Sequence, residues 1–189
     1  MNAPPWYNSQ RRSFCFAGKR AYMSEIEELK KVIKRLRAKD GCPWDREQTH
    51  ASLKGDIMEE AAEVICGINV YEETKNPESM MEELGDLLML VVMESEIASE
   101  EGYFDFEDVS KHVKDKMIHR HPHVFGDVKA DTVSEVLKNW EAIKKDEKSG
   151  REWMDDKTPQ AFDEAIALLE KAKEKKIRKL QQKAAEKQL

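Results

Sequence analysis

The sequence predicts an all-α fold, a helical bundle of four core helices with flanking helices. Charged residues make up 37% of the chain, which holds only 8 Gly and 6 Pro, and this composition favours helix over sheet. Apolar residues also recur at helical spacing in several segments. No segment alternates between apolar and polar residues for long enough to predict a competing strand.

The first two helices are expected over residues 24–39 and 51–71. Ser24 and Glu27 form a capping-box pattern at the start of the first helix, and the segment Asp40-Gly41-Cys42-Pro43 ends it. In the second helix, apolar residues from Leu53 to Ile68 recur on one stripe. Both helices are therefore amphipathic and are expected to bury one face.

The third helix is expected to begin at Asn76-Pro77, an N-cap followed by a first-turn proline, and to reach Ser99. Between Leu84 and Met93 its only polar side chain is Asp86, so we expect the central, fully packed helix of the fold. A lone protomer of four helices would leave this helix poorly covered. The sequence therefore predicts at least a homodimer, with helices exchanged or packed across a two-fold axis.

Three further helices are expected after Gly102. One spans residues 105–120, one begins at the capping-box pattern of Thr132 and Glu135, and one opens at Thr158-Pro159. We expect three regions: a disordered leader over residues 1–22, a helical domain over 23–150, and a C-terminal helix with a basic tail over 151–189.

The charge distribution points to a protein that handles cations. The formal net charge is −6, and residues 171–189 carry eight Lys or Arg against two Glu, which leaves about −12 for the rest of the chain by subtraction. An acidic body argues against a nucleic-acid binder. The 3 Cys show no CxxC spacing, and no run of apolar residues is long enough for a signal peptide or a membrane span. We expect a soluble, cytoplasmic protein.

Four carboxylates on the second and third helices form the candidate metal site. Glu60 and Glu63 lie three residues apart, and Glu83 and Asp86 repeat that spacing, so each pair lies on neighbouring turns of one helix face. Both pairs flank the apolar stripes of their helices. They are therefore expected to face each other along the seam where the two helices pack.

Four carboxylates in a partly dry seam repel one another unless a cation lies between them. Oxygen ligands select a hard ion, so Mg²⁺ is expected, and Mn²⁺ can substitute. A di-iron bundle would require Glu-x-x-His, and no His follows either pair at that spacing. The alternative is that these are ordinary solvated helix charges, which is the better interpretation of a single pair but not of two pairs beside apolar stripes.

The order of the motifs resembles the MazG family of nucleoside triphosphate pyrophosphohydrolases. The resemblance covers about residues 24–150, and its motifs are Gly41-Cys42-Pro43-Trp44-Asp45, Glu59-Glu60-x-x-Glu63, Glu82-Glu83-Leu84-Gly85-Asp86-Leu87-Leu88 and Arg120-His121-Pro122-His123-Val124-Phe125. It implies a helical bundle of the all-α NTP pyrophosphohydrolase type, homodimerisation, Mg²⁺ dependence and cleavage between the α and β phosphates. It also implies that Glu60, Glu63, Glu83 and Asp86 hold the metal. The single motif set resembles a one-domain member.

The resemblance also suggests the groups that bind and activate the substrate. Lys116 and Arg120 match a Lys-x-x-x-Arg substrate-binding pair, although a solvated helix face is an equal alternative without the resemblance. Trp140 and Lys144 repeat that spacing of four residues. Trp140 is equally consistent with a core position. Lys144 departs from the family pattern, in which the residue four positions after this Trp can be a different polar residue. In our hypothesis, Glu59 or Glu63 helps to deprotonate a metal-bound water that attacks the α phosphorus.

Two further motifs are interpreted as structural. His119, His121 and His123 surround Pro122, but alternate residues around a proline rarely converge on one zinc ion, so we expect a helix stop. Trp44 is expected to plug the core rather than to cover the mouth of the site.

Two other functions stay open at this point. One is a specialised relative that acts on dUTP, dCTP or a phosphoribosyl nucleotide. The other is a non-catalytic helical interaction protein, whose basic tail docks on an acidic partner or on nucleic acid.

Overall fold

The computed structural model describes residues 24–186, and this part of the chain consists of helices and loops without a strand. The predicted all-α class is confirmed, whereas the expected leader over residues 1–22 lies outside the described residues. The helices are, in chain order, α2 (Glu25–Arg37), α3 (Pro43–Glu47), α4 (His50–Thr74), α5 (Glu78–Glu100), α6 (Phe106–Arg120), α7 (Pro122–Phe125), α8 (Val133–Lys148), the short 3₁₀ helix η1 (Glu152–Met154) and α9 (Thr158–Glu186).

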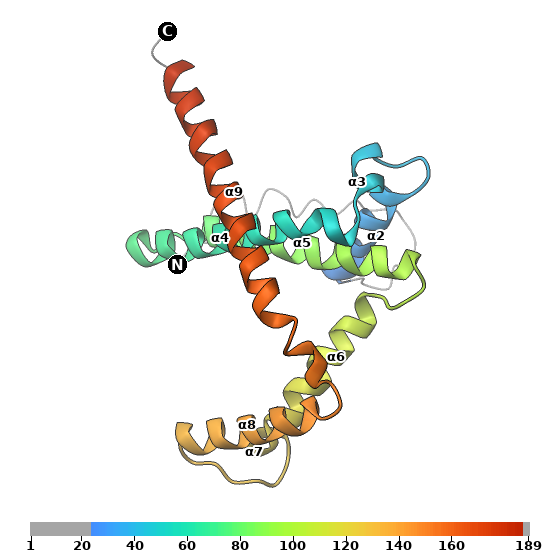
Figure 1. Cartoon of the computed structure of the whole chain (residues 1–189), viewed down its shortest axis with the longest axis vertical. Helices are drawn as coiled ribbons and strands as arrows, with labels where there is room; N and C mark the ends of the chain where they lie inside the picture. The colour runs from blue at the N-terminus through green and yellow to red at the C-terminus, as the bar shows by residue number, and fades with distance from the viewer. Residues whose placement is uncertain (1–23, 187–189) are drawn as a thin grey trace, which may run out of the picture.

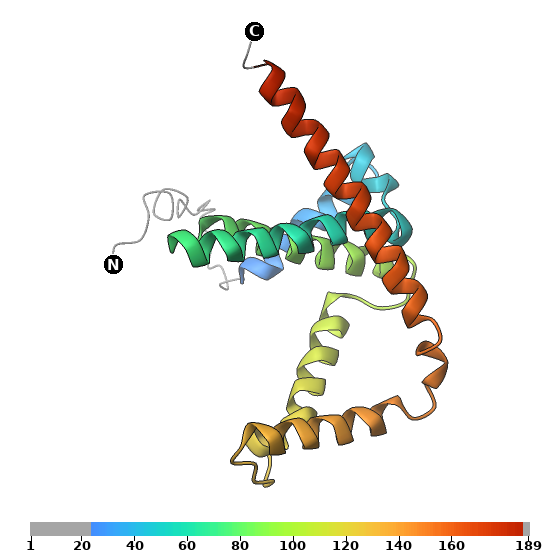
Figure 2. The same ribbon diagram turned by 60° about the vertical axis from the view of Figure 1, so that its left-hand side comes forward.

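The two long helices α4 and α5 pack side by side as a helical hairpin (Figures 1 and 2). Their backbones come very close at Gly67, where an added Cβ would lie 2.7 Å from the Cα of Met80. The side-chain oxygen of Asn76 accepts the backbone N–H of Glu78 at 3.0 Å. The start of α5 is one residue later than expected, because the helix begins at Glu78 and Pro77 stands at its N-cap. This close packing fixes which turns of α4 and α5 face each other.

The buried core lies between α2, α4 and α5. Its fully enclosed apolar side chains are Ile33, Leu53, Leu90, Val92, Met93 and Ile97. On α5, however, Leu84, Leu88 and Val91 keep 49%, 41% and 39% of their surface exposed. The prediction of a fully packed central helix is therefore wrong for the single chain, because neighbouring helices cover only part of its apolar surface.

Helices α6, α7 and α8 form an arm that stands away from the α4–α5 hairpin, and we call residues 106–148 the α6–α8 arm (Figures 1 and 2). After η1 the chain returns, and α9 crosses α4 at a steep angle (Figure 1). None of the described helices combines the length and the apolar character that a bilayer crossing requires.

Three local expectations can be compared with the structure. The capping box at Thr132 and Glu135 is confirmed, with reciprocal hydrogen bonds of 3.0 and 3.3 Å. The prediction of a capping box at Ser24 is wrong, because the Ser24 side chain makes no capping hydrogen bond and Glu27 instead binds Lys30. Trp44 does not plug the core. It lies on the short surface helix α3 and is 60% exposed.

Candidate metal and substrate site

The packing of α4 against α5 brings three carboxylates together. Glu60, Glu83 and Asp86 each offer an oxygen atom, and these oxygens all lie within 4.8 Å of one another. We call these three residues the carboxylate cluster. Glu60 and Glu83 are half-buried and Asp86 is exposed, so three of the four carboxylates predicted for the seam meet at its solvent-facing edge.

Burial and mutual repulsion both disfavour the charged forms in this cluster. Burial is the main cause that raises the pKa of Glu60, and Asp86, Glu63 and Glu83 raise it further. Burial likewise raises the pKa of Glu83, with the charge of Glu63 as the next cause. A bound cation would relieve both effects, since it compensates the lost hydration and the repulsion.

Glu63 and Glu59 lie beside the cluster and are bound by α9 rather than left free. Lys176 forms an ion pair with Glu63, and the Nζ atom of Lys175 donates to Glu59 at 3.0 Å. These two lysines could not be assigned to the site from the sequence, because 113 residues separate Glu63 from Lys176. The basic run in residues 171–189 is evident in the sequence, but the crossing of α9 over α4 is evident only in the structure.

A cavity of about 560 Å³ lies where α9 crosses the hairpin. Its charged lining residues are Glu59, Glu63, Glu83, Lys173 and Lys176, and its apolar ones are Ala62, Cys66, Leu169 and Ala172. This volume is in the range of pockets that hold small-molecule ligands. The cavity therefore offers cationic groups, anionic groups and an apolar surface within one space.

Two of the four expected substrate-binding residues, Arg120 and Trp140, meet in a second cluster on the α6–α8 arm. The Arg120 guanidinium donates to Glu147 at 2.5 and 3.1 Å, and its carbon lies 5.1 Å from the centre of the Trp140 ring. Lys116 is half-buried one turn before Arg120, whereas Lys144 binds Glu141 at 3.4 Å. This cluster is far from the carboxylate cluster within one chain, because the arm stands away from α4 and α5 (Figures 1 and 2).

The histidines that follow α6 have structural contacts. The His121 ring shares a 2.6 Å hydrogen bond between Nδ1 and the Met117 carbonyl oxygen, and it meets the Trp140 ring edge-on with 5.1 Å between centroids. Within residues 24–186, the carboxylate cluster is the one group of three or more ligand-type side chains close enough to hold a metal. The interpretation of this segment as a helix stop agrees with the end of α6 at Arg120.

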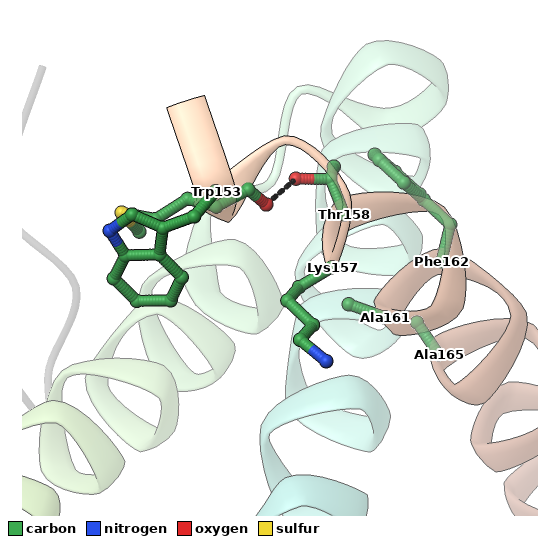
Figure 3. A pocket seen from close by; sticks show the side chains of 7 residues that line it. Trp153, Lys157, Thr158, Ala161, Phe162 and Ala165 are labelled. Atoms are coloured by element: carbon green, nitrogen blue, oxygen red, sulfur yellow. Dashed lines mark hydrogen bonds between the residues drawn. The ribbon is translucent and has the colours of Figure 1, made fainter. Parts of the chain in front are cut away.

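Another recess lies where η1 meets α9, and Trp153 and Phe162 stand on opposite sides of it (Figure 3). Its volume is about 350 Å³. Thr158 donates to the Met154 carbonyl oxygen at 3.1 Å and closes the turn between the two helices. No carboxylate of the described chain lines this recess, so it lacks the groups that a metal-bound polyphosphate requires.

Comparison with known proteins links the carboxylate cluster to one family. Residues 48–125, which contain the whole cluster, match the family model described as the MazG nucleotide pyrophosphohydrolase domain. Over 123 residues the chain is 46% identical to a protein of Thermotoga maritima named nucleoside triphosphate pyrophosphohydrolase/pyrophosphatase MazG, with 65% of this chain and 45% of that protein aligned.

Two further relatives show a similar likeness. A nucleoside triphosphate pyrophosphohydrolase of Escherichia coli K12 is 43% identical over 128 residues, which is 67% of this chain and 47% of that protein. The uncharacterized protein YabN of Bacillus subtilis is 44% identical over 128 residues, which is 68% of this chain and 25% of that protein. The chain thus aligns with a quarter to about half of the length of these relatives.

Proposed function

Because this chain belongs to the MazG family through the nucleotide pyrophosphohydrolase domain at residues 48–125, we propose that it hydrolyses nucleoside triphosphates to nucleoside monophosphates and pyrophosphate, with Mg²⁺ as cofactor. The observation that carries the proposal is the convergence of Glu60, Glu83 and Asp86 from two helices. The names of the Thermotoga and Escherichia relatives support the same reaction.

The donor set fits a hard divalent cation. The cluster offers oxygen atoms alone, and two of its three carboxylates have pKa values raised by burial and by neighbouring negative charge, so a cation would stabilise their charged forms. Glu60, Glu83 and Asp86 would hold the ion, and Glu63 would join them once it leaves Lys176. When bound, Mg²⁺ lowers the pKa of a coordinated water and polarises phosphoryl oxygens; Mn²⁺ can replace it.

Glu59 and Glu63 are the groups placed to accept a proton. Both line the cavity beside the cluster, and a carboxylate there can take the proton of the water that attacks the α phosphorus. The new bond joins the water oxygen to the α phosphorus. The bond that breaks joins this phosphorus to the oxygen bridging to the β phosphorus, so pyrophosphate leaves and the monophosphate remains.

We further propose that a second copy of the chain completes the site. Lys116, Arg120, Trp140 and Lys144 lie on an arm that points away from their own carboxylate cluster. The exposed apolar side chains of α5 provide a surface on which a homodimer could form. In such a dimer, the arm of one protomer would bring a cation and a stacking ring to the phosphates and base held by its partner.

Product analysis tests this function. Each nucleoside triphosphate is incubated with and without Mg²⁺, and pyrophosphate and orthophosphate are measured for the wild type, for Asp86→Asn and for the control Asp156→Asn on the exposed segment before α9. We expect Mg²⁺-dependent pyrophosphate release, at least about 100-fold slower in Asp86→Asn and unchanged in Asp156→Asn. Release of orthophosphate, or equal activity without a divalent ion, would refute the proposal.

The same assay measures substrate range. Including dUTP, dCTP and a phosphoribosyl nucleotide in the panel shows whether the enzyme is broad or specialised. An absence of both hydrolysis and Mg²⁺ binding would favour a non-catalytic interaction protein instead.

A further inference from the structure

Helix α9 brings positive charge to the carboxylates that flank the metal cluster. Lys176 forms an ion pair with Glu63, and Lys175 pairs with Glu59 at 3.0 Å. Three turns earlier, Glu164 of α9 binds Lys54 of α4 at 2.9 Å. The sign of the charge that α9 presents to α4 therefore changes along the helix. Its first half contributes an anionic side chain, and its later part contributes cationic side chains near the cavity.

The two lysines keep their charge and can move. Their pKa values are raised, chiefly by the hydrogen bonds to Glu63 and Glu59, so both are cationic at neutral pH. The side chains of Lys175 and Lys176 are 50% and 54% exposed. A lysine ammonium sits on a flexible four-carbon stem, so it can change partners without a shift of α9.

Binding of the substrate would change which partner is favourable. A divalent cation at the cluster competes with Lys176 for Glu63, because two positive charges near one carboxylate repel each other. A nucleoside triphosphate brings about four negative charges into the cavity, and cationic groups are needed to balance them. Lys176 lines this cavity and is held there by Glu63. Lys175 lies beside it, paired with the lining residue Glu59.

Starting from the proposed function, we propose that Lys176 and Lys175 are substrate-binding residues, which exchange Glu63 and Glu59 for phosphate oxygens when the metal and the triphosphate bind. Helix α9 is then one wall of the substrate pocket, and the freed Glu63 is available to the metal and Glu59 to the attacking water. The apolar residues Leu169 and Ala172 of α9 line the same cavity, so this helix contacts more of the substrate than its phosphates.

A competing explanation is that the lysines only neutralise the carboxylates and hold α9 in place. Both explanations predict that Lys176→Gln binds Mg²⁺ at least as tightly as the wild type, because a competitor for Glu63 is removed. The two explanations differ in the affinity that they predict for the triphosphate. Lys176→Gln should bind it more weakly only if Lys176 contacts the phosphates.

The test measures binding rather than turnover. Isothermal calorimetry with a non-hydrolysable α,β-methylene nucleoside triphosphate and Mg²⁺ compares the wild type, Lys176→Gln, Lys176→Arg and Lys171→Gln. Lys171 is the matched control, since it is exposed, lies about 140° around α9 from Lys176 by helical spacing, and does not line the cavity. We expect about 10-fold or greater loss of affinity for Lys176→Gln, as for a charge-assisted hydrogen bond, less than about 3-fold for Lys176→Arg, and none for Lys171→Gln.

Lysine acetylation of the unmutated protein, followed by mass spectrometry, gives a second measurement that does not depend on how well a variant folds. Mg²⁺ with the analogue should protect Lys175 and Lys176 at least about 3-fold more than Mg²⁺ alone, whereas Lys171 should react equally. Unchanged analogue affinity in Lys176→Gln, with no protection of Lys176, would overturn this inference and leave the proposed function intact. A wild type that neither binds the analogue nor releases pyrophosphate would overturn both.

Discussion

The Arg120 guanidinium holds both carboxylate oxygens of Glu147, which lies 27 residues further along the chain. The pair is half-buried, with 17% and 21% of the two side chains exposed. It ties the end of α6 to the end of α8. The Arg120 hydrogen bond is also the main cause that lowers the pKa of Glu147.

Replacing Glu147 with Gln should therefore loosen the arm in a pH-dependent way. A carboxyl group whose pKa is lower in the folded state stabilises the fold above its unfolded-state pKa, near 4.5, and loses that contribution as the pH falls through the folded value. We expect Glu147→Gln to cost about 1 kcal/mol at pH 7 and less at pH 3. Urea denaturation at both pH values measures the difference; an equal cost at both would show that packing, not charge, is lost.

Replacing Gly67 with Ala should destabilise the α4–α5 hairpin, although this change in a helix interior usually stabilises by about 1 kcal/mol. The new Cβ would lie 2.7 Å from the Cα of Met80, and a backbone atom cannot move aside as a side chain can. We expect a loss of about 2 kcal/mol or more in urea denaturation. Gly55→Ala on the same helix is the control, because its Cβ would meet only Leu168 at 4.0 Å, and it should be neutral or stabilising.

The helices could be predicted because each carries local signals. Thr132 caps its helix as expected, and Asn76 accepts the first backbone N–H of α5 from one residue further out than expected. These signals depend only on neighbouring residues. The Ser24 capping box was predicted from spacing alone and does not form, because its expected partner Glu27 binds Lys30 instead. Local patterns predict where a helix starts better than which hydrogen bonds start it.

The site was predictable where its geometry follows from two adjacent helices. The spacing of two carboxylates on α4 and two on α5 predicted that all four meet. The oxygens of Glu60, Glu83 and Asp86 do so, whereas Glu63 pairs with Lys176 instead. The pairing of Glu63 with Lys176 was not predictable, because it depends on the path of a helix 113 residues away. Trp44 was misplaced for a similar reason: aromatic size alone does not tell whether a short surface helix turns the ring outward.

The apolar stripe of α5 should be an interface between copies of the chain. Met81, Leu84, Leu88 and Val91 are exposed at helical spacing on one face, and we call them the α5 stripe. A charge at its centre, Leu88→Arg, should dissociate the oligomer, which light scattering after size-exclusion chromatography would detect as a fall in mass.

The exposed Val32 on α2 provides a matched control, because Val32→Arg adds the same charge outside the stripe. It should keep the mass of the wild type. If Leu88→Arg also keeps that mass while folded, the interface lies elsewhere. If the wild type itself is a monomer at assay concentration, the proposal that a second copy completes the site is wrong.

Neutralising Glu60 should have opposite effects with and without metal. Its pKa is raised in the folded protein, first by burial and then by Asp86 and other carboxylates. The folded state thus holds the proton more strongly than the unfolded state, so metal-free stability falls as the pH rises above the unfolded-state value near 4.5. Metal-free Glu60→Gln should be more stable than the wild type by about 1 kcal/mol at pH 7.5 and equal to it near pH 4.

Adding Mg²⁺ should reverse this order. A ligand at about 100 times its Kd adds about 2.7 kcal/mol to the stability of the state that binds it. Glu60→Gln replaces one of the three carboxylates of the cluster with a neutral amide, which attracts the cation less strongly. Thermal unfolding with EDTA and with Mg²⁺ measures both effects. The exposed residue Glu73 on α4 gives the control Glu73→Gln, which should follow the wild type in both conditions. A Glu60→Gln variant that is less stable than the wild type in EDTA would show that this carboxylate stabilises the empty site, contrary to the repulsion on which the metal assignment depends.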